Sequence, residues 1–217
     1  MDRRNFIRLV GGGAVAAVAL PGCSADYPAS AVAAWAGPPA SAEARRWALG
    51  HAILAPNSHN RQPWLADLRE PNTIVLFVDR ERMLPETDPW FRQIVVSQGT
   101  FLELLVIALR ERGIEPRVEV FPDGDFAPRQ VDGRPVARIA WTPGAAAAAK
   151  DPLYAQILRR QTAKVDYDTS RPVAPEVLQT LATALPPDSG HGVRFAGTVE
   201  AARLEVLRQL CSDAAKV

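Results

Sequence analysis

The sequence from Asp88 to Gly113, DPWFRQIVVSQGTFLELLVIALRERG, places apolar side chains on nearly every turn of a predicted helix. Asp88 followed by Pro89 is typical of a helix start, with an N-cap acid and proline at the first helical position. Gly113 favours a helix end, and Pro116 lies just beyond it. Because apolar residues surround this helix almost completely, we expect it to be the long, buried, central helix of the fold.

Predicted strands lie on both sides of this helix in the sequence. Thr73–Val78 is β-branched and apolar, and the segments 117–121 and 135–141 have the same character. A second helix is expected from a cap at Ser41 to about residue 55. The strands and helices mix without regular βαβ alternation, which predicts an α+β class with helices packed on a mixed or antiparallel sheet.

Composition narrows the class of protein. The 217 residues are 47% hydrophobic and 23% charged, which excludes a wholly disordered chain and a multi-span membrane protein. The net charge of +1 argues against a nucleic-acid partner. Two cysteines, Cys23 and Cys211, are too few for a disulfide scaffold or a four-cysteine metal site. We therefore expect no metal site, and the histidines lack metal-ligand spacing: His51, His59 and His191.

A hydrolase triad is the first enzymatic alternative. Ser58, His59 and Asp67 supply the residue types, but Ser58 and His59 are adjacent and the chain has no Gly-x-Ser-x-Gly elbow. This alternative is therefore weak, and the sequence indicates no catalytic residue.

The N-terminal residues 1–23 have the pattern of an export signal. Arg3-Arg4 is followed by a short apolar run, which is too short to span a bilayer, and resembles a twin-arginine signal. The run ends in Leu20-Pro21-Gly22-Cys23, which resembles a lipoprotein processing site. We expect export to the periplasm or another extracytoplasmic space, a lipid anchor at Cys23, and a tether over residues 24–40, which are rich in Ala, Pro and Ser.

Two polar segments are candidates for binding. Between Pro56 and Pro63, residues 57–62 crowd amide, hydroxyl and imidazole groups into a stiff loop, which suits a planar polar ligand such as a flavin ring. By composition alone, an ordinary polar turn is the better explanation of this loop. Residues 159–164, Arg-Arg-Gln-Thr-Ala-Lys, suit a phosphate group, with a solvated charge run as the alternative.

Together the two segments resemble the FMN-dependent nitroreductase family. Residues 56–64 match its Pro-Ser-x-x-Asn-x-Gln-Pro-Trp loop, with Asn57 in place of the usual serine. Residues 160–164 match its Arg-x-Ser/Thr-x-Lys/Arg segment, and Gln98-Gly99 with the helix that follows resembles the family's central helix. The resemblance covers roughly residues 45 to 200 and implies a nitroreductase-like fold.

The order of the segments resembles one branch of that family. The arginine segment follows the loop here, whereas in single-unit members it precedes the loop, so the chain is similar to the fused, double-unit, Acg-like branch. The resemblance implies a first unit over residues 41–150 and an incomplete second unit over residues 151–217, with a worn copy of the loop near residues 185–195. The resemblance also implies that this chain is truncated at its C-terminus. In the full-length chain the two units would form a pseudo-dimer; the alternative is a homodimer.

The resemblance implies a single FMN site shared between the units. Its cofactor-binding residues come from the first unit's loop and from the arginine segment: Pro56, Asn57, Ser58, Asn60, Gln62, Arg160, Thr162 and Lys164. The implied function is a nitroreductase-type oxidoreductase that passes electrons through flavin N5 to a small nitroaromatic or quinone-like acceptor. Two alternatives stay open: an exported protein that binds or sequesters FMN without turnover, and an exported lipoprotein that has lost its flavin site.

Overall fold

The computed structural model describes residues 28–184 and 195–214. It divides the chain into two compact units at Thr162 and Ala163. The sequence had predicted that the second unit begins at residue 151. With the division at Thr162, Arg160 and Thr162 lie in the first unit and Lys164 lies in the second. The expected signal and Cys23 lie outside the described residues, as do the first residues of the tether and almost all of the worn loop.

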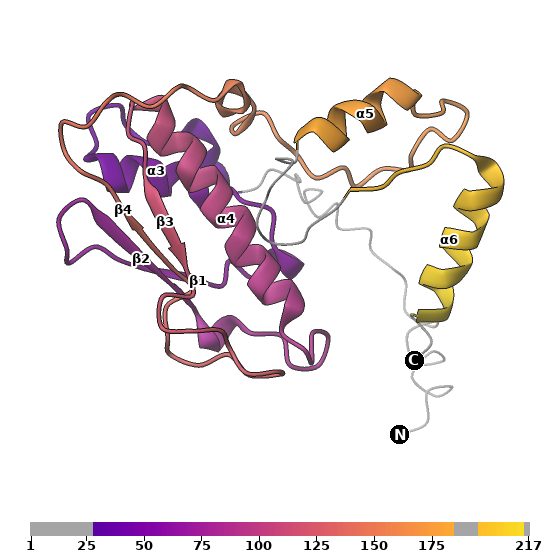
Figure 1. Ribbon diagram of the computed structural model, residues 1–217, viewed down its shortest axis with the longest axis horizontal. Coiled ribbons are helices and arrows are strands. Elements are labelled where there is room, and N and C mark those ends of the chain that lie inside the picture. The colour runs from indigo at the N-terminus through magenta and orange to yellow at the C-terminus, as the bar shows by residue number, and fades with distance from the viewer. Residues whose placement is uncertain (1–27, 185–194, 215–217) are drawn as a thin grey trace, which may run out of the picture. The chain divides into compact units, whose positions relative to one another are not determined.

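The first unit contains a four-stranded antiparallel sheet in the order β1-β2-β4-β3 (Figure 1). Its strands are β1 (Trp64–Asp67), β2 (Thr73–Val78), β3 (Arg117–Val120) and β4 (Ala137–Ala140). Thr73–Val78 was predicted with these bounds, and the strands expected near 117–121 and 135–141 are present but shorter. Strand β1 was not predicted, because this four-residue edge strand, which pairs Trp64 with Val78, has no alternating burial pattern.

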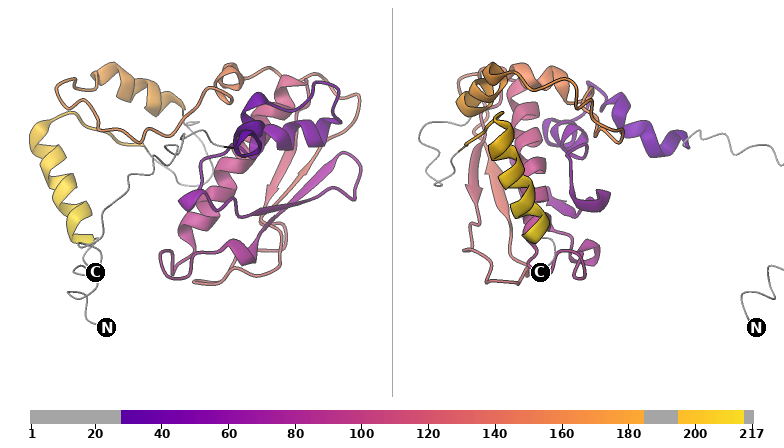
Figure 2. Two further views of the ribbon diagram at one scale, coloured as in Figure 1. Left: turned by 180° about the vertical axis from the view of Figure 1, so that it is seen from behind. Right: turned by 90° about the vertical axis from the view of Figure 1, so that its right-hand side faces the viewer.

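Two helices, α3 (Ala44–Ala52) and α4 (Arg92–Glu111), cover one face of the sheet (Figure 2). The alternate residues Ile74 and Leu76 of β2 are fully buried against Phe101 and Leu105 of α4. This arrangement confirms the α+β class, with helices packed on an antiparallel sheet. By length and composition α4 could cross a membrane, but much of its surface is buried in this core.

The start of α4 differs from the prediction. The helix begins at Arg92 rather than Pro89, because Phe91 adopts a left-handed conformation (φ 54°) that cannot continue a helix. Asp88 still caps it from a distance, since its carboxylate accepts a hydrogen bond from the Ile94 N–H at 3.0 Å. The end is as predicted, with Gly113 left-handed at φ 73°. The burial is less complete than expected, because Val96 is 59% exposed.

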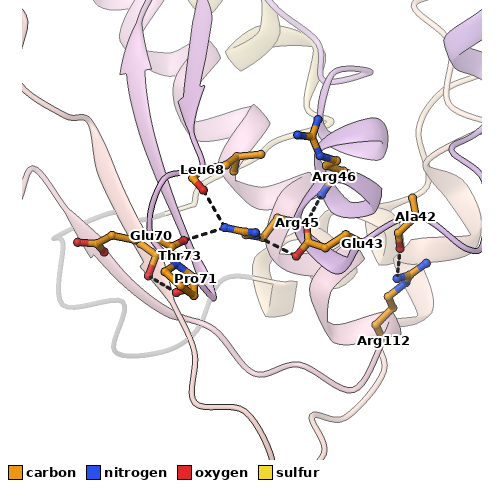
Figure 3. Close-up of polar contacts among 9 residues, drawn as sticks. All are labelled: Ala42, Glu43, Arg45, Arg46, Leu68, Glu70, Pro71, Thr73 and Arg112. Atoms are coloured by element: carbon orange, nitrogen blue, oxygen red, sulfur yellow. Dashed lines mark hydrogen bonds and ion pairs between the residues drawn. The ribbon is translucent and has the colours of Figure 1, made fainter.

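Arginine side chains connect the start of α3 and the end of α4 to neighbouring segments through hydrogen bonds (Figure 3). The N-cap of α3 is Glu43, which accepts from the Arg46 N–H, so the expected cap at Ser41 is wrong. Arg45 donates to the carbonyls of Leu68 and Glu70 in the β1–β2 connection, at 2.9 and 2.7 Å. Arg112, just after α4, donates to two carbonyls of the segment before α3, those of Ala40 and Ala42.

Short helical turns flank this core. Within the expected tether, α2 (Ala29–Val32) and η1 (Ala33–Ala36) are helical. After β4, Asp151 caps a turn of 3-10 helix, η4 (Pro152–Gln156), by accepting from the Leu153 N–H at 2.8 Å. A further 3-10 turn, η3 (Arg80–Arg82), follows β2.

The second unit contains α5 (Pro175–Ala184) and α6 (Ala201–Ala214). Neither helix has a buried residue among those described. Their apolar side chains are about half exposed, including Leu181 at 48% and Leu207 at 50%. Cys211 is exposed on α6.

Candidate functional site

The loop from Pro56 to Pro63 joins α3 to β1 and contains the turn η2 (Ser58–Asn60). The Asn57 amide closes this loop on itself. Its Nδ2 donates to the Ala55 carbonyl at 3.0 Å, and its Oδ1 accepts from the Gln62 N–H at 2.8 Å. Asn57 therefore braces the loop, a role that follows from the structure and not from the sequence.

The loop backbone is held in an uncommon conformation. His59, Asn60 and Gln62 all have positive φ values, of 51°, 51° and 52°. Non-glycine residues adopt this region rarely, and such residues cluster at ligand-binding and catalytic sites. The surrounding contacts must hold this loop in place.

Three polar side chains of α4 supply those contacts. The Ser58 N–H donates to Ser97 Oγ at 3.1 Å, and the Ser97 hydroxyl in turn donates to the Gln93 carbonyl at 2.6 Å. Gln98 Nε2 donates to the Pro63 carbonyl and the Thr100 hydroxyl donates to the Pro56 carbonyl, both at 2.6 Å. The central helix therefore clamps the loop at its beginning, middle and end.

We call Ser97, Gln98 and Thr100 the α4 clamp. They are positioning residues that the sequence analysis missed. The signal that could have found them is a group of polar side chains in a helix that is otherwise apolar. Ser97 and Gln98 are buried, at 2% and 0% exposure, and buried polar groups require partners.

Several loop side chains remain free for a ligand. Within the described residues, the Ser58 hydroxyl and the side-chain amides of Asn60 and Gln62 make no hydrogen bond. Asn60 and Gln62 are exposed, and Ser58 is partly buried. Arg61, by contrast, is used internally, because it donates to the carbonyls of Glu81 and Arg82 in η3.

Arg160 lies beside the start of the loop. Its Nη2 donates to the Leu54 carbonyl at 2.7 Å, two residues before Pro56. Its guanidinium carbon lies 5.7 Å from the Trp35 ring centroid, and its Nε is buried with no hydrogen-bond partner among the described residues. The structure therefore brings Arg160 and the loop together within the first unit.

The other two predicted binding residues of the arginine segment are exposed. Thr162 is exposed at the end of the first unit, and its side chain makes no hydrogen bond to the described residues. Lys164 is exposed in the second unit. Arg160 is the member of the predicted trio for which the described residues show a hydrogen bond beside the loop, to the Leu54 carbonyl.

A buried aromatic cluster connects α3 to the segment that carries Arg160. His51 Nδ1 donates to the Trp47 carbonyl at 3.0 Å, which leaves Nε2 to accept from the Tyr154 hydroxyl at 3.2 Å. Burial lowers the pKa of His51 below its usual 6.5 and raises the pKa of Tyr154 above 10.0. His51 is therefore a buried histidine whose two ring nitrogens both have partners in this cluster.

No model of a known protein family matches the chain. Parts of it are similar to proteins of Mycobacterium tuberculosis. "Putative NAD(P)H nitroreductase Rv3131" is 38% identical over 82 residues, which are 38% of this chain and 24% of that protein. "Putative NAD(P)H nitroreductase acg" is 36% identical over 72 residues, 33% of this chain and 22% of that protein.

A third protein of that organism covers more of the chain. "Uncharacterized protein Rv3127" is 34% identical over 122 residues, 54% of this chain and 34% of that protein. The matches thus span between 22% and 34% of the length of these relatives. Part of this chain is thus similar to part of two proteins named as nitroreductases, and its first unit has an α+β fold.

Proposed function

We propose that this chain binds FMN and belongs to a nitroreductase-type oxidoreductase that reduces a small nitroaromatic or quinone-like acceptor. The observation that carries the proposal is the loop 56–63, a strained polar loop braced by Asn57 and held by the α4 clamp. The similarity of parts of this chain to two proteins named as NAD(P)H nitroreductases supports the reaction class.

The free groups around the loop fit a flavin. The ring system of FMN presents carbonyl acceptors and ring N–H donors at its polar edge, and amide side chains such as those of Asn60 and Gln62 can pair with both kinds of group. The unpartnered Nε of Arg160 fits an anionic or carbonyl oxygen. We propose Pro56, Asn57, Ser58, Asn60, Gln62, Arg160, Thr162 and Lys164 as the cofactor-binding set.

Each of these residues has a distinct task in the proposal. Pro56 and Asn57 keep the loop stiff, while Ser58, Asn60 and Gln62 orient the ring. Arg160, Thr162 and Lys164 bind the phosphate or pyrimidine end, Arg160 through its planar fork and Lys164 as a point charge. When bound, FMN supplies the hydride and electron chemistry, and the protein contributes orientation and exclusion of water.

Flavin retention tests the proposal directly. The purified protein is mixed with FMN, desalted, and its visible spectrum recorded with the wild type, Arg160→Ala and Arg159→Ala. Arg159 is the matched control, because its exposed side chain makes no hydrogen bond among the described residues. We expect the wild type and Arg159→Ala to stay yellow and Arg160→Ala to lose the flavin while its far-ultraviolet spectrum is unchanged. A folded wild type that retains no flavin would refute FMN binding.

Turnover separates the enzyme from a protein that only holds FMN. Under anaerobic conditions, addition of NADPH should bleach the bound flavin, and addition of a nitroaromatic should restore its colour. Bound flavin that stays oxidised with NADPH and with dithionite-reduced mediators would indicate sequestration rather than catalysis.

We also propose that the chain is exported by the twin-arginine route and anchored through Cys23. The sequence pattern around Arg3-Arg4 and Cys23 carries this proposal. Metabolic labelling with a radioactive fatty acid should mark the wild type and leave Cys23→Ser unlabelled, with Cys211→Ser as the control that keeps its label.

A further inference from the structure

A cavity of about 450 Å³ lies beside the start of α4, and the proposed flavin loop contributes no residue to its lining. Its walls come from residues 90–96 and from the β3–β4 connection, residues 121–131. The lining is rich in aromatic side chains: Trp90, Phe91, Phe121 and Phe126. Its volume falls within the range of small-molecule sites, about 300–1,000 Å³.

Several lining residues belong to a hydrophobic cluster of the first unit. Ile94 and Val131 are buried in that cluster, and Phe91, Phe121 and Phe126 pack against it. Phe121 and Phe126 meet edge to face with ring centroids 5.5 Å apart. The aromatic walls are therefore fixed by packing against the body of the unit, while Trp90 at the rim is 53% exposed.

The backbone around the cavity is unusual in the same way as the flavin loop. Phe91, Phe121 and Arg129 have φ values of 54°, 50° and 60°. Bulky side chains in the left-handed region are genuine outliers and accumulate at ligand-binding positions. Three of them line this cavity.

The charge at the rim favours an anion. Arg92 and Arg129 both line the cavity, and neither forms an ion pair within the described residues. The Arg129 guanidinium lies 3.6 Å from the Trp90 ring centroid, stacked against the indole. The single acid in the lining is Asp125.

We propose that this cavity is a second ligand site, which binds a planar aromatic molecule carrying an anionic group. Trp90 and the three phenylalanines stack with or flank the ring system, and Arg92 and Arg129 pair with a carboxylate or sulfonate. The proposal does not depend on flavin binding, because the cavity is formed by residues outside the proposed FMN set.

The probe 1-anilinonaphthalene-8-sulfonate tests this site, because it is a planar aromatic anion whose fluorescence rises in an apolar pocket. The protein is titrated without FMN as wild type, Arg129→Gln, Arg92→Gln/Arg129→Gln and Arg203→Gln. Arg203 is an exposed arginine of α6, and it controls for probe bound to the exposed apolar residues there. N-phenyl-1-naphthylamine, which lacks the sulfonate, is titrated in parallel.

We expect Arg129→Gln to weaken sulfonate binding about fivefold and the double variant more, since each arginine supplies an exposed charge contact. Arg203→Gln should bind like the wild type, and the uncharged probe should bind all four proteins alike. Equal affinity of wild type and double variant for the sulfonate would overturn the proposal. So would an equal loss of the uncharged probe, which would make the arginines structural rather than anion-binding.

Discussion

Replacement of Gln98 by methionine should stabilise the protein, although it removes a buried hydrogen bond. Gln98 is fully buried, and its Nε2 donates to the Pro63 carbonyl at 2.6 Å. Its Oε1, however, has no partner among the described residues. Gln98 thus makes one hydrogen bond and leaves one buried acceptor unsatisfied.

The magnitude follows from these two contributions. The lost hydrogen bond contributes about 0.5–1.5 kcal/mol, and the unsatisfied acceptor costs about 1–3 kcal/mol. Pro63 keeps a partner after the change, because its carbonyl also accepts from the Asp79 N–H at 3.0 Å. Methionine has nearly the volume of glutamine, so packing changes little. We expect Gln98→Met to raise the free energy of unfolding by about 1 kcal/mol.

Urea unfolding followed by tryptophan fluorescence measures this change. With a urea dependence of about 1–3 kcal/mol per molar, the midpoint should rise by about 0.3–1 M. Gln93→Met is the matched control on the exposed side of the same helix and should leave the free energy of unfolding within about 0.5 kcal/mol of the wild type. If Gln98→Met instead lowers the free energy of unfolding by 2 kcal/mol or more, the reasoning is refuted, because Oε1 must then accept a stabilising hydrogen bond.

Three further outcomes follow from the site. Asn57→Ala should lower the free energy of unfolding by about 1–2 kcal/mol, and Asn57→Asp, which keeps the acceptor for the Gln62 N–H, by about half as much in the same urea titration. Asp88→Ala should destabilise by about 1–3 kcal/mol because it strands the buried Ile94 N–H, whereas Asp88→Asn keeps an oxygen there and should restore most of the loss. Stability should fall as the pH drops below 6.5, because the unfolded chain protonates His51 before the folded protein, in which burial lowers its pKa. Urea midpoints at several pH values should show a weaker pH dependence in His51→Gln, and an unchanged dependence would contradict that assignment.

The amino-acid sequence was sufficient for elements with a strong local signal. The strand Thr73–Val78 has its predicted bounds because a β-branched apolar run between turns has few alternatives. The long helix ends at Gly113 as predicted, since glycine tolerates the left-handed cap. The loop 56–63 was recognised as a polar loop from its composition and as a candidate site through the family resemblance, although its backbone conformation was not predicted.

Two features without a strong local signal were not predicted correctly: the start of α4 and the strand β1. The start of α4 was placed too early because Phe91, which packs against the cluster that contains Val131, is left-handed, and no local sequence signal indicates that conformation. The edge strand β1 was missed because only its pairing with β2 makes it a strand.

By itself, the sequence determined the α+β class and marked the loop and the arginine segment as candidates for one site. Only the tertiary structure decided which polar groups meet. The Gln98–Pro63 and Arg160–Leu54 hydrogen bonds join residues 35 and 106 positions apart. Such contacts depend on how the helices and the sheet pack, and no local propensity encodes that packing. The same packing leaves Asn60, Gln62 and the Nε of Arg160 without partners among the described residues, and these unpaired groups are what the proposed cofactor would satisfy.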